Sequence, residues 1–90
     1  MIQNVPRGNY GVEEGALFRR SLGGAMAEIA EVVEIGRDPM GIPHIRYNAY
    51  LMRGLVRASA AEQRTLALDS FRARYKERIQ TENDKPDVSD

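Results

Sequence analysis

Residues 27–52 decide the fold, and they read Ala27-Glu-Ile-Ala-Glu-Val-Val-Glu-Ile35, Gly36-Arg-Asp-Pro-Met-Gly-Ile-Pro43 and His44-Ile-Arg-Tyr-Asn-Ala-Tyr-Leu-Met52. In the last segment one phase carries Ile45, Tyr47, Ala49 and Leu51, and the other carries His44, Arg46, Asn48 and Tyr50. Successive side chains of a strand point to opposite faces, so this alternation predicts a half-buried β-strand. Asp38, Pro39 and Gly41 suit the first, second and fourth positions of a tight turn. The stretch therefore predicts a β-hairpin.

The first arm of this hairpin has two interpretations. As a strand, its apolar residues share a face with Glu31, so either Glu31 lies at a sheet edge or a bulge shifts the phase between Ala30 and Val32. As a helix, residues 22–35 form an apolar stripe that ends at Gly36. Two glycines in the first helical turn and the β-branched run before the turn favour the strand. We expect the strand and keep the helix as the alternative.

Upstream, residues 16–22 predict a first strand, which Gly23-Gly24 ends. Residues 1–15 contain Pro6 and several glycines and predict an irregular lead-in. The expected domain organisation is this lead-in at 1–15, one small globular domain at 16–80 and an acidic tail at 81–90. The tail has little apolar surface to offset the entropy of ordering, so we expect it to be disordered.

Residues 59–80 also have two interpretations. In the first they form a single helix, with Ser59 and Glu62 as a capping box. In the second, residues 64–68 form a strand, and Asp69 or Ser70 caps a short helix that carries Phe71, Tyr75 and Ile79. Helix propensity alone favours the single helix. That alternative would make the protein α+β, with a central hairpin and a long helix at 59–80.

Composition indicates a small soluble domain. The chain has 90 residues and no cysteine, so disulfides and thiolate metal sites are excluded. No apolar segment approaches the roughly 20 residues that span a bilayer, and the N-terminus does not read as a signal peptide. We therefore expect a cytoplasmic protein with no membrane partner. The net charge is zero, but the tail holds four carboxylates against Lys85, so the rest of the chain carries +3.

One resemblance supports the strand-then-helix interpretation. The segment Gly41-Ile-Pro-His44, followed later by Arg64-Thr-Leu-Ala-Leu68, resembles a group of small, uncharacterised bacterial proteins. The resemblance covers about half the chain. It implies a mainly β fold, a small Src-homology-3-like barrel with a short C-terminal helix. It implies no catalytic residue and no cofactor.

The sequence holds no set of residues that predicts catalysis or metal binding. His44 is the one histidine, and a metal site needs several convergent ligands. We therefore expect no enzyme, no catalytic or cofactor-binding residues and no metal. The candidate interaction surface consists of aromatic and basic residues on the hairpin and the terminal helix: His44, Arg46, Tyr50, Arg53, Arg72 and Arg74.

These features predict a small non-enzymatic interaction module, with an unknown protein as the expected partner. The alternative is nucleic-acid binding, because tyrosine offers a flat surface for stacking and arginine adds a planar charge. The remaining alternative is that these residues only keep the protein soluble, with the aliphatic parts of the arginine side chains covering apolar groups. Nothing in the sequence selects an oligomeric state.

Overall fold

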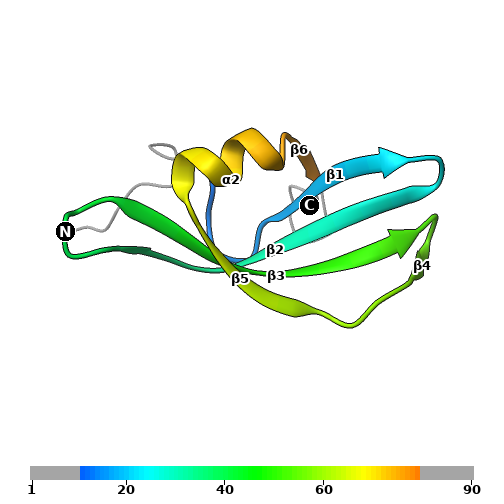
Figure 1. Ribbon diagram of the computed structural model, residues 1–90, viewed down its shortest axis with the longest axis horizontal. Helices are drawn as coiled ribbons and strands as arrows, with labels where there is room; N and C mark the ends of the chain where they lie inside the picture. Colours follow the sequence, from blue (N-terminus) through cyan, green and yellow to red (C-terminus); the bar gives the residue numbers. More distant parts are fainter. Residues whose placement is uncertain (1–10, 80–90) are drawn as a thin grey trace, which may run out of the picture.

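The structure is a computed structural model, and it describes residues 11–79. In chain order, this part contains β1 (Leu17–Gly23), β2 (Met26–Arg37), β3 (Pro43–Arg53), β4 (Val56–Arg57), β5 (Glu62–Ala67), the helix α2 (Leu68–Arg74) and β6 (Glu77–Ile79). The chain is mainly β, as expected, and carries one short helix within the described range (Figure 1). No helix in that range has the length and apolar character needed to cross a membrane. The predicted tail at 81–90 and most of the lead-in lie outside the described residues.

The strands form one antiparallel sheet in the order β6-β1-β2-β3, and the far edge of β3 pairs with both β5 and β4. The sheet is open, with β6 at one edge and β5 at the other. The helix α2 connects β5 to β6 and lies over one face of the sheet (Figure 1). We call this the inner face, which carries Phe18, Ala30 and Tyr47, and we call the opposite side the outer face.

The central hairpin is confirmed. β2 pairs with β3 along its length, from Met26 opposite Arg53 to Arg37 opposite Pro43. At the turn, Oδ1 of Asp38 accepts hydrogen bonds from the backbone N–H groups of Met40 and Ile42, each over 2.9 Å. The N–H of Gly41 donates to the Asp38 carbonyl over 2.8 Å, and its φ of 83° favours glycine. Local turn chemistry therefore sets the register of the hairpin.

The bulge in β2 lies later than the sequence predicts. The pairing is continuous through Ala30 and Val32, and the register shifts between Val32 and Glu34. The extra residue is thus Val33, and a bulge between Ala30 and Val32 is wrong. Glu31 does not lie at a sheet edge, because β2 is an interior strand. The helical alternative for residues 22–35 is also wrong.

The core lies between the inner face and α2. Phe71 of the helix is fully buried, and its ring centroid lies 5.4 Å from Phe18, 5.1 Å from Tyr47 and 5.0 Å from Tyr75. The Phe18 and Tyr47 contacts are edge-to-face, and aromatic pairs at such distances add to the free energy gained from burial. Aliphatic residues pack around this aromatic group, namely Val12, Ala16, Ala30, Val32, Ile45, Ala49 and Leu68. Val12 belongs to the predicted lead-in, whose described part therefore contributes to the core.

The strand-then-helix interpretation of the C-terminal region is confirmed, and a single helix over 59–80 is wrong. β5 pairs with β3 from Glu62 to Ala67 before α2 begins. Two details differ from the prediction. The N-cap is Ala67 without a side-chain cap hydrogen bond, so neither Asp69 nor Ser70 caps the helix. Ile79 lies beyond the helix, in β6 opposite Leu17.

The segment between β3 and β5 makes its own contacts with the sheet. The hydroxyl of Ser59 accepts a hydrogen bond from the N–H of Leu51 over 2.9 Å and donates one to the carbonyl of Ala60 over 3.1 Å. Ser59 therefore extends the edge of β3, and the capping box that its spacing with Glu62 suggested does not form.

Candidate functional site

The candidate surface that the sequence predicts is divided by the sheet. His44, Arg46 and Tyr50 lie on the outer face of β3, as their phase predicts, because they alternate with the buried Ile45, Tyr47 and Ala49. Arg72 and Arg74 belong to α2, which covers the inner face (Figure 1). Arg53 ends β3 opposite Met26. The six residues therefore do not form one continuous surface.

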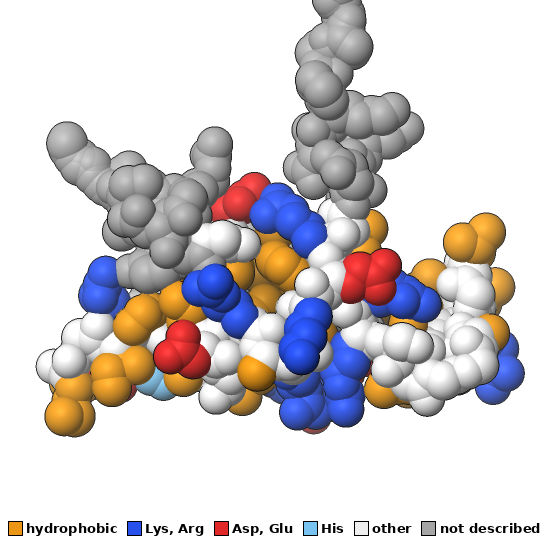
Figure 2. Space-filling view, turned by 90° about the horizontal axis from the view of Figure 1, so that it is seen from above, with side chains coloured by type: hydrophobic (Ala, Val, Ile, Leu, Met, Phe, Trp, Pro, Cys, Tyr) orange, Lys and Arg blue, Asp and Glu red, His pale blue; other side chains and the backbone are white. Residues whose placement is uncertain are grey.

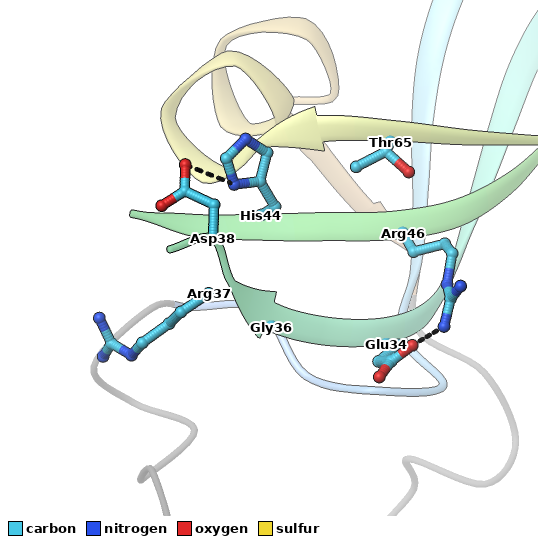
Figure 3. Close-up of a pocket in the computed structure, with 7 residues that line it drawn as sticks. All are labelled: Glu34, Gly36, Arg37, Asp38, His44, Arg46 and Thr65. Carbon is cyan, nitrogen blue, oxygen red and sulfur yellow. Dashed lines mark ion pairs between the residues drawn. The ribbon is translucent and has the colours of Figure 1, made fainter. Parts of the chain in front are cut away.

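A depression of about 450 Å³ lies on the outer face where β2, β3 and β5 approach the hairpin turn (Figure 3). Most of the residues that line it are polar or charged, with charges of both signs: Glu34, Gly36, Arg37, Asp38, His44, Arg46 and Thr65. Nδ1 of His44 lies 3.8 Å from Oδ2 of Asp38 and 3.1 Å from the Ile42 carbonyl oxygen. Arg46 forms an ion pair with Glu34.

These contacts favour a structural role for His44. Its ring contacts the turn that it follows, and Asp38 uses its other oxygen to close that turn. Among residues 11–79, no three histidine, cysteine or acidic side chains are grouped so that they would hold a metal ion. Arg46 therefore pairs with Glu34, and Asp38 and Arg37 both form hydrogen bonds with the backbone of the turn.

Further along the outer face, Arg57 stacks on Tyr50, with its guanidinium carbon 4.1 Å from the ring centroid. Tyr50 lies opposite Ile29, which is only 6% exposed although it points away from the main core. Aromatic and arginine side chains thus cover a small apolar area on this face, as expected when a long basic side chain packs along apolar surface.

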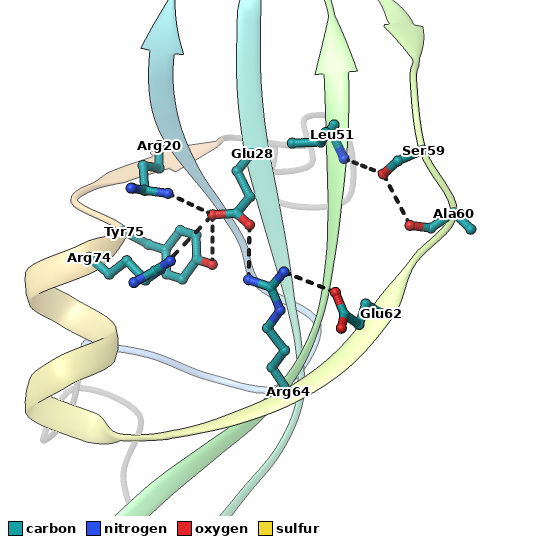
Figure 4. Close-up of polar contacts among 9 residues, drawn as sticks. All are labelled: Arg20, Glu28, Leu51, Ser59, Ala60, Glu62, Arg64, Arg74 and Tyr75. Carbon is teal, nitrogen blue, oxygen red and sulfur yellow. Dashed lines mark hydrogen bonds and ion pairs between the residues drawn. The ribbon is translucent and has the colours of Figure 1, made fainter.

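A second group of residues, which sequence reasoning missed, surrounds Glu28 on the inner face (Figure 4). The Glu28 side chain is 8% exposed. Its Oε1 accepts hydrogen bonds from Nη1 of Arg20 over 3.0 Å and from the Tyr75 hydroxyl over 3.1 Å. Its Oε2 accepts one from Nη1 of Arg64 over 3.0 Å, and Nε of Arg74 lies 4.0 Å from Oε1. We call Glu28, Arg20, Arg64, Arg74 and Tyr75 the Glu28 cluster.

The sequence contained part of the signal for this cluster. Glu28 shares the phase of Ala30 and Val32, so a strand through this segment places it on the core face. Its partners come from β1, β5 and α2, and no local pattern brings these elements together. A carboxylate is rarely buried unless it is paired, so the core-facing phase of Glu28 predicts a basic partner but does not identify it.

The surroundings of the cluster keep its donors protonated. Burial raises the pKa of the Tyr75 phenol above its usual value of 10, and a hydrogen bond with Tyr47 raises it further. The hydrogen bond to Glu62 and the charge of Glu28 raise the pKa of Arg64. Tyr75 therefore remains a hydrogen-bond donor to Glu28 at neutral pH.

Large apolar side chains are exposed at one end of the sheet, where the β1–β2 and β3–β4 turns lie together (Figure 1). Leu55 is 96% exposed, Val56 67% and Leu22 44%. The N–H of Gly54 donates to the carbonyl of Ala25 over 2.9 Å and ties the two turns together. We call Leu22, Leu55 and Val56 the apolar turn end.

The other end of the sheet also exposes apolar residues, at the β2–β3 turn, where Met40 is 82% exposed and Ile42 46%. Figure 2 shows hydrophobic side chains gathered toward both ends of the long axis, with lysine and arginine side chains between them. In the same view, acidic and hydrophobic side chains are interspersed among the basic ones in the middle.

Comparison with known proteins adds no assignment: neither the family models nor the curated proteins and solved structures searched include a match to this chain.

Proposed function

We propose that the chain is a small, cytoplasmic, non-enzymatic interaction module that binds a protein partner. The observation that carries this proposal is the apolar turn end. Burying a valine or leucine side chain is worth about 1.5–3 kcal/mol, and here Leu55 and Val56 leave most of their surface in water. Grouped exposed aliphatic side chains on tied turns are typical of a contact surface.

We also propose that the sheet and helix form a Src-homology-3-like fold. The order β6-β1-β2-β3-β5, with a short helix between β5 and β6, supports a Src-homology-3-like arrangement. Small folds of this kind serve many functions, so the fold itself selects none of them. The contact surface therefore has to be tested directly.

The test places a photo-reactive benzoylphenylalanine at position 55 and, in a matched control, at position 69. Asp69 is exposed on α2, away from the apolar turn end. In lysate of the organism that makes the protein, we expect a discrete cross-linked product from position 55 alone. Unlabelled wild-type chain should compete with its formation, and the Leu55→Asp variant should not. Equal competition by both chains would contradict the proposal.

Nucleic-acid binding is the second candidate, and the Tyr50–Arg57 stack favours it. A half-buried aromatic ring with a guanidinium stacked on it resembles the surfaces on which bases stack. It ranks second because neighbouring arginines of the outer face are paired with carboxylates, Arg46 with Glu34 and Arg19 with Glu77. It predicts binding of single-stranded RNA or DNA that weakens steeply with salt and is lost in Tyr50→Ala. No binding at low salt would exclude it.

A further inference from the structure

Two arginines of the Glu28 cluster are held side by side at the surface of the inner face. Nη1 of Arg20 lies 3.0 Å from Oε1 of Glu28, and Nε of Arg74 lies 4.0 Å from the same oxygen. The side chains of Arg20 and Arg74 are 37% and 43% exposed, whereas that of Glu28 is 8% exposed. One buried carboxylate thus orients two guanidinium groups that remain open to solvent (Figure 4).

The cluster has a surplus of positive charge and of donors. Arg64 divides its donors between Glu28 and Glu62, so three guanidinium groups share two carboxylates. A guanidinium has five N–H donors. Within residues 11–79, Arg20 makes its polar contact with Glu28, and Arg74 contacts Glu28 and the hydroxyl and ring of Tyr75. Both side chains therefore retain donors that no residue of the described chain accepts.

Such a pair is prearranged for an anion. A guanidinium binds a carboxylate through two parallel hydrogen bonds. Most of the entropic cost of ordering an arginine side chain is avoided when another contact already fixes it. Glu28 provides that contact for Arg20 and draws Arg74 toward the same point.

The surroundings distinguish between a protein carboxylate and a nucleic-acid phosphate. Next to the cluster, the same face carries Leu51 opposite Glu28 and Met26 one step further, both half-buried, and it continues to the exposed Val56. The aromatic rings that the structure describes on this face are all buried, namely Phe18, Tyr47, Phe71 and Tyr75. A base would find no ring to stack on, whereas an apolar side chain finds aliphatic contacts.

We infer that Arg20 and Arg74 bind a carboxylate of an extended, acidic segment of the protein partner, whose neighbouring apolar side chains contact Leu51 and Met26. This inference rests on the proposed protein-binding function and names the chemistry of the segment that is bound. It places recognition on the inner face, where Arg74 of the predicted candidate surface lies, and not on the outer face with His44 and Arg46.

The test is a titration of the full chain, labelled with nitrogen-15, followed at the arginine Nε–H resonances. The probe is a blocked pentapeptide of alternating leucine and glutamate, and its control is the same peptide with glutamine. We expect the glutamate peptide to shift the Nε–H resonances of Arg20 and Arg74, and the glutamine peptide to bind about tenfold more weakly. Equal binding of both peptides, or no shift at millimolar peptide, would overturn the inference.

Matched variants locate the site. Arg20→Gln and Arg74→Gln should each weaken binding of the glutamate peptide about fivefold or more. Arg19→Gln is the control on β1, because adjacent strand residues face opposite sides, and Arg72→Gln is the control on α2. Equal weakening by a control would show that only general charge matters, and the inference would be wrong.

Inorganic phosphate and an oligouridylate at the same ionic strength complete the titration. If either shifts the two arginine resonances at lower concentration than the glutamate peptide, the site is one for phosphate, and the inference is overturned. These measurements need no natural partner. If the peptide binds while cross-linking at position 55 fails, the arginine site stands and the proposed contact at the apolar turn end does not.

Discussion

The hydroxyl of Tyr75 donates a hydrogen bond to Oε1 of Glu28 over 3.1 Å and so joins residues 47 positions apart in the chain. Tyr75 is the C-cap residue of α2, and Glu28 lies in the interior strand β2. The bond fixes the end of the helix over the inner face. Because both side chains are buried, the contact matters for the stability of the fold as well as for the position of the arginines.

Glu28→Gln should destabilise the protein. The substitution keeps the size of the side chain but removes the charge that balances Arg20 and Arg64. Loss of one member of a buried ion pair costs about 3–5 kcal/mol, and the partial exposure of these arginines reduces the expected loss to about 2 kcal/mol. Urea unfolding of wild type and variant measures it. Glu31→Gln, at an exposed position of the same strand, is the control and should change the free energy of unfolding by less than about 0.5 kcal/mol.

Stability should fall at alkaline pH through Tyr75. Its folded-state pKa is raised above the usual value of 10, so the folded state favours the neutral phenol. The stabilisation that this provides is complete below pH 10 and is lost as pH rises above 10 and the unfolded chain ionises. At pH 7, Tyr75→Phe should lower the free energy of unfolding in urea by about 1 kcal/mol. Above pH 10, its stability should decline less steeply than that of wild type.

The control for this pH series is Tyr50→Phe on the outer face. It removes a phenol outside the Glu28 cluster and should leave the alkaline decline close to that of wild type. If Tyr75→Phe declines as steeply as wild type between pH 10 and pH 11, the Tyr75 phenol does not contribute to the pH dependence of stability, and the prediction is wrong.

The aromatic core predicts a graded response at Phe71. This ring is fully buried against Phe18, Tyr47 and Tyr75. Phe71→Leu keeps an apolar side chain but removes ring contacts, and we expect a loss of about 1–2 kcal/mol. Phe71→Ala should cost about 3–5 kcal/mol, a large share of the stability of so small a domain. The free energies of unfolding of the two variants, compared with that of the exposed Arg72→Ala, test the order.

The hairpin could be predicted because its determinants are local. Asp38 and Gly41 close the turn through bonds within five residues, and the alternation of β3 places Ile45 and Tyr47 on one face without reference to the rest of the chain. The position of the bulge could not be predicted, because it depends on how β2 pairs with β3. A shift at Val33 lets both Val32 and Ile35 face the core.

Long-range contacts also decide the C-terminal region. Helix propensity favours one helix over 59–80, but pairing with β3 holds residues 62–67 as a strand. For the same reason the residues of the candidate surface are divided between two faces of the sheet. The outer-face phase of His44, Arg46 and Tyr50 follows from β3 alone. The placement of Arg74 beside Glu28 depends on where α2 packs, which the sequence did not determine.

The sequence predicts local hydrogen bonds for both Asp38 and Asp69, and the structure shows them for Asp38. Oδ1 of Asp38 accepts two backbone hydrogen bonds, whereas Asp69 lies in the first turn of α2, whose N-cap has no side-chain bond. Asp38→Ala should therefore cost about 1–2 kcal/mol. Asp69→Ala should cost no more than about 0.5 kcal/mol, from the helix dipole alone. Urea unfolding at pH 7 measures both, and an equal loss in the two variants would contradict the prediction.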